Sequence, residues 1–228
     1  MSTSLNRLNQ EIVACSRCPR LVDFRQSISK TKRKKYINWD YWGKPVPGFG
    51  DPEARLLLVG LAPAAHGGNR TGRVFTGDKS ADFLVKCLYE VGLANQPNSD
   101  SMNDGLRLNR TYVTPVLKCV PPGDKPRPEE LSNCFSYFQR ELDVLTSVTH
   151  VVALGRIAFR GCLKIWQARQ SLRVKDFPFG HGKFYNPDGQ TTLVACYHPS
   201  PRNVNTGRLT HGAMIGLLKR VKKASGIG

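Results

Sequence analysis

Short apolar segments alternate with segments of helical periodicity along most of this chain. Residues 55–61 form a nearly continuous apolar run, which is typical of a strand buried on both faces of a sheet. Further strands are predicted over residues 110–119, 149–154 and 191–196. Apolar spacing and helix-start signals predict helices over residues 4–14, 79–91, 128–145, 156–166 and 207–223.

This alternation predicts an α/β fold in which helices cover a parallel sheet on both sides, a three-layer α/β/α sandwich. Ligands of such folds bind at the carboxyl ends of the strands. Two loops of unusual composition follow strands in this chain: residues 62–77, and the loop that begins at His198. These two loops are therefore the candidate ligand-binding region.

The net charge indicates the kind of partner. The chain has 228 residues with 34 Lys and Arg against 17 Asp and Glu, a formal charge of +17, while its charged fraction is an ordinary 22 %. This combination predicts a folded protein with a basic face for a polyanion, and it argues against a disordered polyelectrolyte. The length suits one domain or two small ones.

The hydropathy pattern also excludes some locations. No run of about 18 apolar residues occurs, so no membrane-spanning helix is expected. The segment Met1–Cys15 lacks the apolar core of a signal peptide, so an intracellular, cytoplasmic protein is expected. Two basic runs, residues 30–35 and 219–223, are each more typical of a solvated face, but the charge of +17 predicts that at least one contacts the polyanion.

Four of the seven cysteines form a candidate metal site. Cys15 and Cys18 have the spacing of a chelating pair, and Cys119 and Cys134 lie a hundred residues further on. Four such thiolates could enclose zinc or a [4Fe–4S] cluster, and the spacing does not separate the two. The alternative is that only the first pair is special and that the others are core thiols.

The other three cysteines fit the hydrophobic core. Cys87 lies on a predicted helix stripe, Cys162 within another helix and Cys196 in a strand. Buried thiols behave as small apolar side chains, so we expect these three to be structural.

The first loop, from Gly60 to Asp78, contains five glycines in its first 18 residues, which lets the backbone approach a ligand closely. A phosphate-binding Walker loop is rejected, because Asp78 stands between Gly77 and Lys79 and would repel phosphate. The position of Asp78 before a helix favours an N-cap, and a catalytic acid is the other interpretation. The two roles are compatible. Phe75 and His66 are the aromatic and imidazole groups of this loop.

The second loop, His198-Pro-Ser-Pro, is stiffened by two prolines. An imidazole at a strand end could donate a hydrogen bond to a developing anion. Asn203 is a further candidate donor to a ligand. The alternative is a solvated turn in which Ser200 has an ordinary turn role.

These segments together form a pattern that covers most of the chain. It comprises Cys15-x2-Cys18-Pro, residues 41–51, the loop from Gly60 to Asp78, Lys118-Cys119-x-Pro-Pro, Cys134, and His198-Pro-Ser-Pro. The combination resembles the family 5 (UDGb type) uracil-DNA glycosylases.

The resemblance implies a single domain over residues 1–228 with a central four-stranded parallel sheet between helices. It implies a [4Fe–4S] cluster and removal of uracil and other deaminated or damaged bases from DNA, in a monomer associated with the nucleoid. The implied cluster ligands are Cys15, Cys18, Cys119 and Cys134. The implied catalytic residues are Asp78 and His198, and the implied base contacts are Gly60, Ala62, Ala64, Phe75 and Asn203.

Two features distinguish the chain from related glycosylases. The stretch Gly60–Ala64 has no polar side chain where other families carry a water-activating Asp or Asn, which leaves Asp78 as the substitute. Pro115 stands where family 4 enzymes have a uracil-reading Asn, so discrimination between bases is expected to be loose. The competing hypotheses are a non-catalytic, metal-stabilised nucleic-acid-binding module and a nucleotide-hydrolysing α/β enzyme, which the inserted Asp78 opposes.

Overall fold

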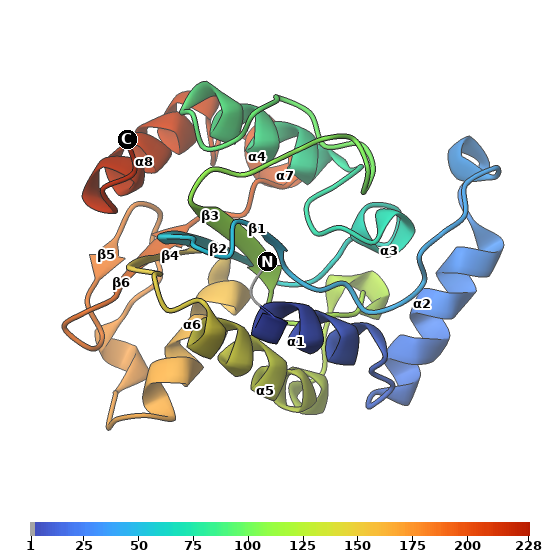
Figure 1. Ribbon diagram of the computed structural model, residues 1–228, viewed down its shortest axis with the longest axis horizontal. Helices are drawn as coiled ribbons and strands as arrows, with labels where there is room; N and C mark the ends of the chain where they lie inside the picture. The colour runs from blue at the N-terminus through green and yellow to red at the C-terminus, as the bar shows by residue number, and fades with distance from the viewer. Residues whose placement is uncertain (1–2) are drawn as a thin grey trace.

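The structure is a computed structural model that describes residues 3–228, and its centre is a mixed sheet (Figure 1). Within these residues the sheet has six strands in the order β1-β3-β2-β4-β6-β5. The strands are β1 (Phe49–Gly50), β2 (Leu56–Gly60), β3 (Thr111–Pro115), β4 (His150–Leu154), β5 (Phe184–Tyr185) and β6 (Thr192–Cys196).

The four central strands β3, β2, β4 and β6 are parallel, as the sequence predicts. These four strands are the centre of a larger, mixed sheet, because β1 and β5 add antiparallel edges that the sequence did not predict. Both edge strands have two residues, which is too short for an alternating pattern to be visible in the sequence.

Helices cover both faces of the sheet, as expected for three layers (Figure 1). One face packs against α4 (Lys79–Glu90) and α8 (His211–Ala224), which also contact each other. The other face packs against α1 (Thr3–Val13), α5 (Pro128–Val144) and α6 (Arg156–Gln167). No helix among residues 3–228 is long and apolar enough to cross a membrane.

The alternation of side chains along β2 divides the core in two. Leu56 and Leu58 belong to the cluster under α4 and α8, whereas Leu57 and Val59 belong to the cluster under α5 and α6. Successive residues of a strand point to opposite faces, so a strand that is covered on both sides must be apolar throughout. The prediction of buried thiols is confirmed: Cys87, Cys162 and Cys196 are core residues.

Several elements have no counterpart in the sequence prediction. The helix α2 (Pro19–Thr31) buries only Leu21 and Arg25, so it has almost no apolar stripe. The two candidate loops contain the short helices α3 (Gly68–Thr71) and α7 (Pro201–Asn205). Three single turns complete the described fold: η1 (Lys34–Tyr36), η2 (Pro122–Asp124) and η3 (Val174–Asp176).

A buried ion pair lies beyond the carboxyl end of β3. Lys118 Nζ is 2.5 Å from Glu141 Oε2 and donates to Thr114 Oγ1 at 2.7 Å. Glu141 also accepts from the hydroxyl of Thr114 and from the backbone N–H of Gly48. Both charged side chains are at most 2 % exposed, so each depends on the other for its compensating charge.

Removing one member of this pair should be strongly destabilising. Glu141→Ala leaves the Lys118 ammonium buried and uncompensated, and we expect a loss of about 3–5 kcal/mol in the free energy of unfolding. Denaturant unfolding measures this loss. The matched control is Asp143→Ala, which breaks the exposed pair with Arg169 and should cost less than about 1 kcal/mol. Equal costs for the two variants would contradict the assignment.

Candidate active site and cysteine-lined cavity

Asp78 is the N-cap of α4, as its position before the helix predicts. Its Oδ1 accepts hydrogen bonds from the backbone N–H groups of Ser80 at 2.9 Å and Ala81 at 3.1 Å. Its other oxygen, Oδ2, accepts no hydrogen bond from residues 3–228. The carboxylate is therefore fixed by one oxygen and has the second available for a ligand or a water.

The backbone of Gly67 lies close to the Asp78 carboxylate. A Cβ atom on Gly67 would lie 2.1 Å from Asp78 Oδ2, so only glycine allows this close approach. Burial raises the pKa of Asp78, and the Asp82 charge acts in the same direction. The N–H groups of Ala81 and Ser80 and the charge of Arg70 oppose that rise.

Arg70 joins the two backbone segments that flank the carboxylate. Its Nε donates to the carbonyl of His66 at 2.7 Å, and its Nη2 donates to the carbonyl of Gly77 at 3.0 Å. The guanidinium carbon lies 4.0 Å from the ring centroids of both Tyr36 and Trp39. Arg70 is 3 % exposed and held on several sides, and these contacts fix its position beside Asp78.

A pocket of about 540 Å³ opens above these groups. Its walls combine four acidic and four basic side chains with aromatic and small residues. They are Arg33, Lys35, Tyr36, Trp39, Ala64, Ala65, His66, Gly67, Arg70, Gly77, Asp78, Lys79, Asp82, Asp100 and Asp124.

Phe75 and His198 form the second part of the candidate site. Their ring centroids are 6.0 Å apart with an interplanar angle of 32°, so the structure brings the two candidate loops together. Phe75 has a φ of +46°, an unusual conformation for an aromatic residue. A Cβ atom on Gly60 would lie 2.8 Å from the Phe75 ring, so Gly60 makes room for that ring.

A buried hydrogen-bond network around Arg73 and Ser99 stabilises the unusual backbone conformation of Phe75. Arg73 is buried and pairs with Asp104 at 2.6 Å, and it also donates to the hydroxyls of Thr76 and Ser99. Ser99 donates to the carbonyl of Phe75 at 3.0 Å. This network fixes the loop from both sides of Phe75, and strained conformations persist where such contacts determine them.

His198 is held as a neutral imidazole. Burial lowers its pKa to about 4, although the nearby Asp124 carboxylate acts in the opposite direction. Its ring makes no hydrogen bond within residues 3–228. At neutral pH the ring therefore carries one N–H donor and one free acceptor, which suits donation to an incoming group.

The side chain of Asn203 hydrogen-bonds to the His198 loop itself. Its Nδ2 donates to the carbonyl of His198 at 2.8 Å. Ser200 caps α7, with its Oγ accepting from the backbone N–H of Asn203 at 3.4 Å. The structure thus gives Asn203 a role in positioning the loop, and its predicted contact with a base stays a prediction.

The remaining predicted contacts are backbone positions. The Ala64 carbonyl accepts from the N–H groups of Gly67 and Asn69, which turns the chain into α3. Ala64 also borders the Asp78 pocket. Ala62 packs at the edge of the cluster that includes the four candidate cysteines.

All four candidate cysteines line one small cavity. Cys15 and Cys18 come from the segment between α1 and α2, Cys119 follows β3, and Cys134 lies in α5. The other walls are largely apolar, and all four cysteines are free thiols. No group of three or more His, Cys, Asp or Glu among residues 3–228 is arranged to hold a metal ion.

Hydrogen-bond donors and burial surround these thiols in a way that suits their use as metal ligands. The backbone N–H of Lys118 donates to Cys134 Sγ at 3.3 Å, and Asn133 Nδ2 donates to Cys18 Sγ at 3.6 Å. Burial raises the pKa of Cys119 to about 12 and that of Cys134 to about 11. Thiols of this kind become thiolates on binding a metal, which releases their protons. The donor types therefore suit a metal or cluster with sulfur ligands, although no three of them are arranged around one metal ion in residues 3–228.

Sequence reasoning missed three contributors to the site. Arg70 and Asp124 resembled ordinary surface charges in the sequence, and no pattern distinguished them. Tyr41 belongs to residues 41–51, which carry part of the family resemblance but no predicted site role, and its hydroxyl is 3.0 Å from His66 Nδ1. Only their position next to the other site residues identifies these three, and the tertiary structure is needed to show that position.

Comparison with known proteins identifies the family of this chain. Residues 47–222 match the family model of the uracil DNA glycosylase superfamily. The chain therefore belongs to this superfamily, and its fold is α/β.

Individual relatives narrow the assignment. The chain is 47 % identical to a type-5 uracil-DNA glycosylase of Pyrobaculum aerophilum, covering 94 % of this chain and 91 % of the relative. It is also 47 % identical to the type-5 enzyme of Thermus thermophilus, covering 96 % and 97 %. A type-4 enzyme of Archaeoglobus fulgidus is 29 % identical, covering 86 % and 82 %. The chain thus belongs to the type-5 uracil-DNA glycosylases.

The electrostatic role of Arg70 can be measured without an activity assay. Arg70→Gln removes a charge that lowers the pKa of Asp78, so that pKa should rise further above its ordinary value. Carbon-13 NMR titration of the Asp78 carboxyl measures the shift. The control is Lys79→Gln, which removes an exposed cation and should move the pKa less. An unchanged Asp78 pKa in Arg70→Gln would refute this role.

Proposed function

We propose that this protein removes uracil and other deaminated or damaged bases, such as hypoxanthine and modified pyrimidines, from DNA by hydrolysing the N-glycosidic bond. The proposal is supported by the Phe75–His198 ring pair, which brings the two candidate loops together in a type-5 chain, and by the Asp78 carboxylate, which has one oxygen without a hydrogen bond from residues 3–228. The curated relatives are named for action on uracil in DNA.

The basic surface supplies affinity. Neutralisation of phosphates by Lys and Arg gives binding that depends on salt but not on sequence. The run Lys30–Lys35 adjoins the Asp78 pocket through Arg33 and Lys35, and both of these side chains are exposed. The target nucleotide is then extruded from the stack, and the His198-Pro-Ser-Pro loop fills the gap it leaves.

The base binds in the part of the site formed by Phe75 and His198. Phe75 stacks on the base, and main-chain groups of Gly60, Ala62 and Ala64 meet its edge. His198 donates a hydrogen bond as negative charge grows on the departing base, and a neutral imidazole can do this. No side chain of Gly60–Ala64 reads the base edge, which supports a broad substrate range.

Asp78 acts on the sugar side. Its Oδ2 holds the attacking water and accepts its proton, and the carboxylate stabilises positive charge on the sugar. Lys79 is exposed and pairs with Asp82 at 3.2 Å, unlike the desolvated lysines that form Schiff bases. This supports a monofunctional enzyme that leaves an abasic site.

Cys15, Cys18, Cys119 and Cys134 would hold a [4Fe–4S] cluster in the cysteine-lined cavity. The convergence of four thiols from three segments and the N–H to sulfur bonds support this assignment. Such a cluster would be structural and would join the segment before α2, the chain that follows β3, and α5. The protein works as a cytoplasmic monomer at the nucleoid.

Asp78→Asn tests the catalytic role. Asparagine keeps the oxygen that caps α4 but loses the charge and the basicity, so we expect single-turnover excision of uracil to fall by about 10²–10⁴-fold with DNA affinity retained. The control is Asp82→Asn, an exposed acid in the first turn of the same helix, which should stay near the wild-type rate. A wild-type rate in Asp78→Asn would refute the mechanism.

The metal assignment has its own test. The purified protein should be brown, with iron and acid-labile sulfide in near-equal amounts, and Cys134→Ser should lose the visible absorption. Cys162→Ser is the matched control, because Cys162 is a buried thiol of the core and should leave the absorption unchanged. A colourless protein containing zinc would overturn the cluster and, if it also lacked excision, would favour the non-catalytic binding module.

A further inference from the structure

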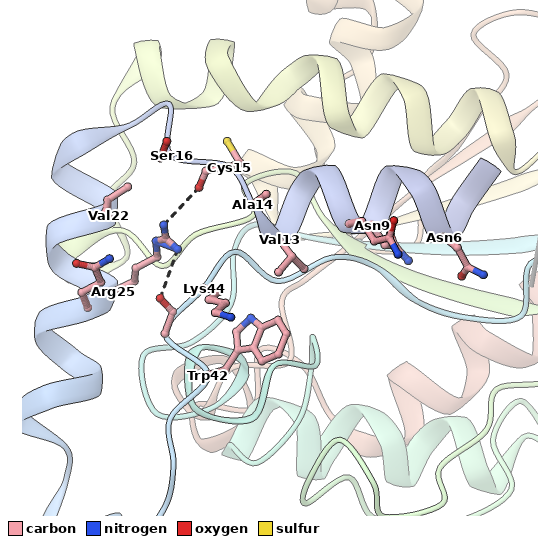
Figure 2. A pocket seen from close by; sticks show the side chains of 13 residues that line it. Asn6, Asn9, Val13, Ala14, Cys15, Ser16, Val22, Arg25, Trp42 and Lys44 are labelled. Atoms are coloured by element: carbon pink, nitrogen blue, oxygen red, sulfur yellow. Dashed lines mark hydrogen bonds between the residues drawn. The ribbon is translucent and has the colours of Figure 1, made fainter. Parts of the chain in front are cut away.

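Arg25 connects the cysteine-lined cavity to a neighbouring segment of chain. It lies on α2, is 5 % exposed, and donates to the carbonyls of Cys15 and Gly43, each at 3.3 Å (Figure 2). Its own backbone carbonyl accepts from Asn69 Nδ2 at 3.2 Å. One buried residue therefore contacts a predicted cluster ligand, the segment before β1, and α3.

The segment that contains Gly43 is in turn paired with α3. The backbone N–H of Trp42 donates to the carbonyl of Arg70 at 2.9 Å, and that of Gly43 donates to the carbonyl of Asn69 at 3.0 Å. Gly43 has a φ of +59°, and a Cβ there would lie 2.9 Å from Ser29 Oγ of α2. The fit between α2 and this segment is thus close, which limits how far either can move alone.

Arg70 completes the connection to the carboxylate. Its side chain donates hydrogen bonds to the carbonyls of His66 and Gly77. His66 is followed in the chain by Gly67, which lies against the Asp78 carboxylate, and Gly77 is followed by Asp78 itself. Every step from Cys15 to Asp78 is therefore a hydrogen bond or a chain neighbour. The Arg25 and Arg70 residues in this series are themselves buried, at 5 % and 3 % exposed.

We propose that Arg25 and Arg70 are positioning residues that transmit the placement of the Cys15 segment to the Asp78 carboxylate. This inference rests on the proposed catalytic role of Asp78. It gives the cysteine-lined cavity a part in catalysis: a chain segment that is fixed at Cys15 fixes α3 through Arg25, and α3 fixes the backbone on both sides of the carboxylate.

A purely structural role for Arg25 makes a different prediction. If Arg25 only stabilises the fold, its loss lowers the stability and the iron content, and the effects of Arg25 and Arg70 variants on the rate multiply. If the two residues act through one connection, the second substitution adds little once the first is made. A double-mutant cycle with a readout of local order therefore separates the two roles.

The experiment compares Arg25→Gln, Arg70→Gln and the double variant in the full-length, iron-loaded protein. We expect Arg25→Gln to retain its visible absorption, to slow single-turnover uracil excision by about tenfold, and to speed amide hydrogen exchange in residues 64–78. Exchange in α8 should stay unchanged. The double variant should be at most about twofold slower than Arg70→Gln alone.

Arg140→Gln is the control. Arg140 lies on α5 outside the cysteine-lined cavity, and its side chain pairs with Glu11 of α1 at the surface. It should leave the rate and the exchange of residues 64–78 unchanged. Asn69→Ala provides a second variant should Arg25→Gln lose iron, because it removes a bond to Arg25 without touching the Cys15 segment.

Unchanged exchange in residues 64–78, or rate effects that multiply, would overturn the inference. The inference would also be overturned if Arg25→Gln were slow and had lost its iron while Asn69→Ala remained fully active. Failure of the proposed function has a different signature, namely full activity of Asp78→Asn. The exchange measurement still tests the connection in that case, because it does not depend on excision.

Discussion

The candidate site depends on the balance of opposing effects on the partly buried Asp78 carboxylate. Burial alone would favour the neutral acid, since desolvation penalises the ionised form. The opposing groups are the N–H donors of Ser80 and Ala81 and the guanidinium of Arg70, which come from two different helices. Burial and the N–H donors of α4 have the largest effects on the pKa of the carboxylate, and Arg70 of α3 adds a smaller effect that lowers it.

The positive charge of the protein has two separate uses. Arg25, Arg70, Arg73 and Lys118 are buried, and each is bonded to carbonyls, carboxylates or hydroxyls of its own chain. Such cations orient backbone and side chains where the dielectric constant is low. The many exposed Lys and Arg side chains remain for a polyanion, which is where the net charge of +17 bears on DNA.

The sequence predicts the central fold well because the strongest signals come from burial. The four parallel strands and the helices α1, α4, α5, α6 and α8 all have an apolar pattern that must be covered. Edge strands of two residues and the helix α2, which buries only Leu21 and Arg25, carry little such pattern. Their positions follow from tertiary contacts, so pattern alone could not find them.

The same distinction applies to the site. The sequence by itself indicated that Phe75 and Asp78 follow one strand and that His198 follows another, and the carboxyl ends of parallel strands share one edge of the sheet. It also supplied the four cysteines and the glycines that permit close approach. Only the tertiary structure decided that Arg70 adjoins Asp78, that Asn203 holds the His198 loop, and that Arg25 links the cysteines to α3. These contacts join residues that are far apart in the chain. The packing of whole helices and strands brings such residues together, and no local sequence pattern encodes that packing.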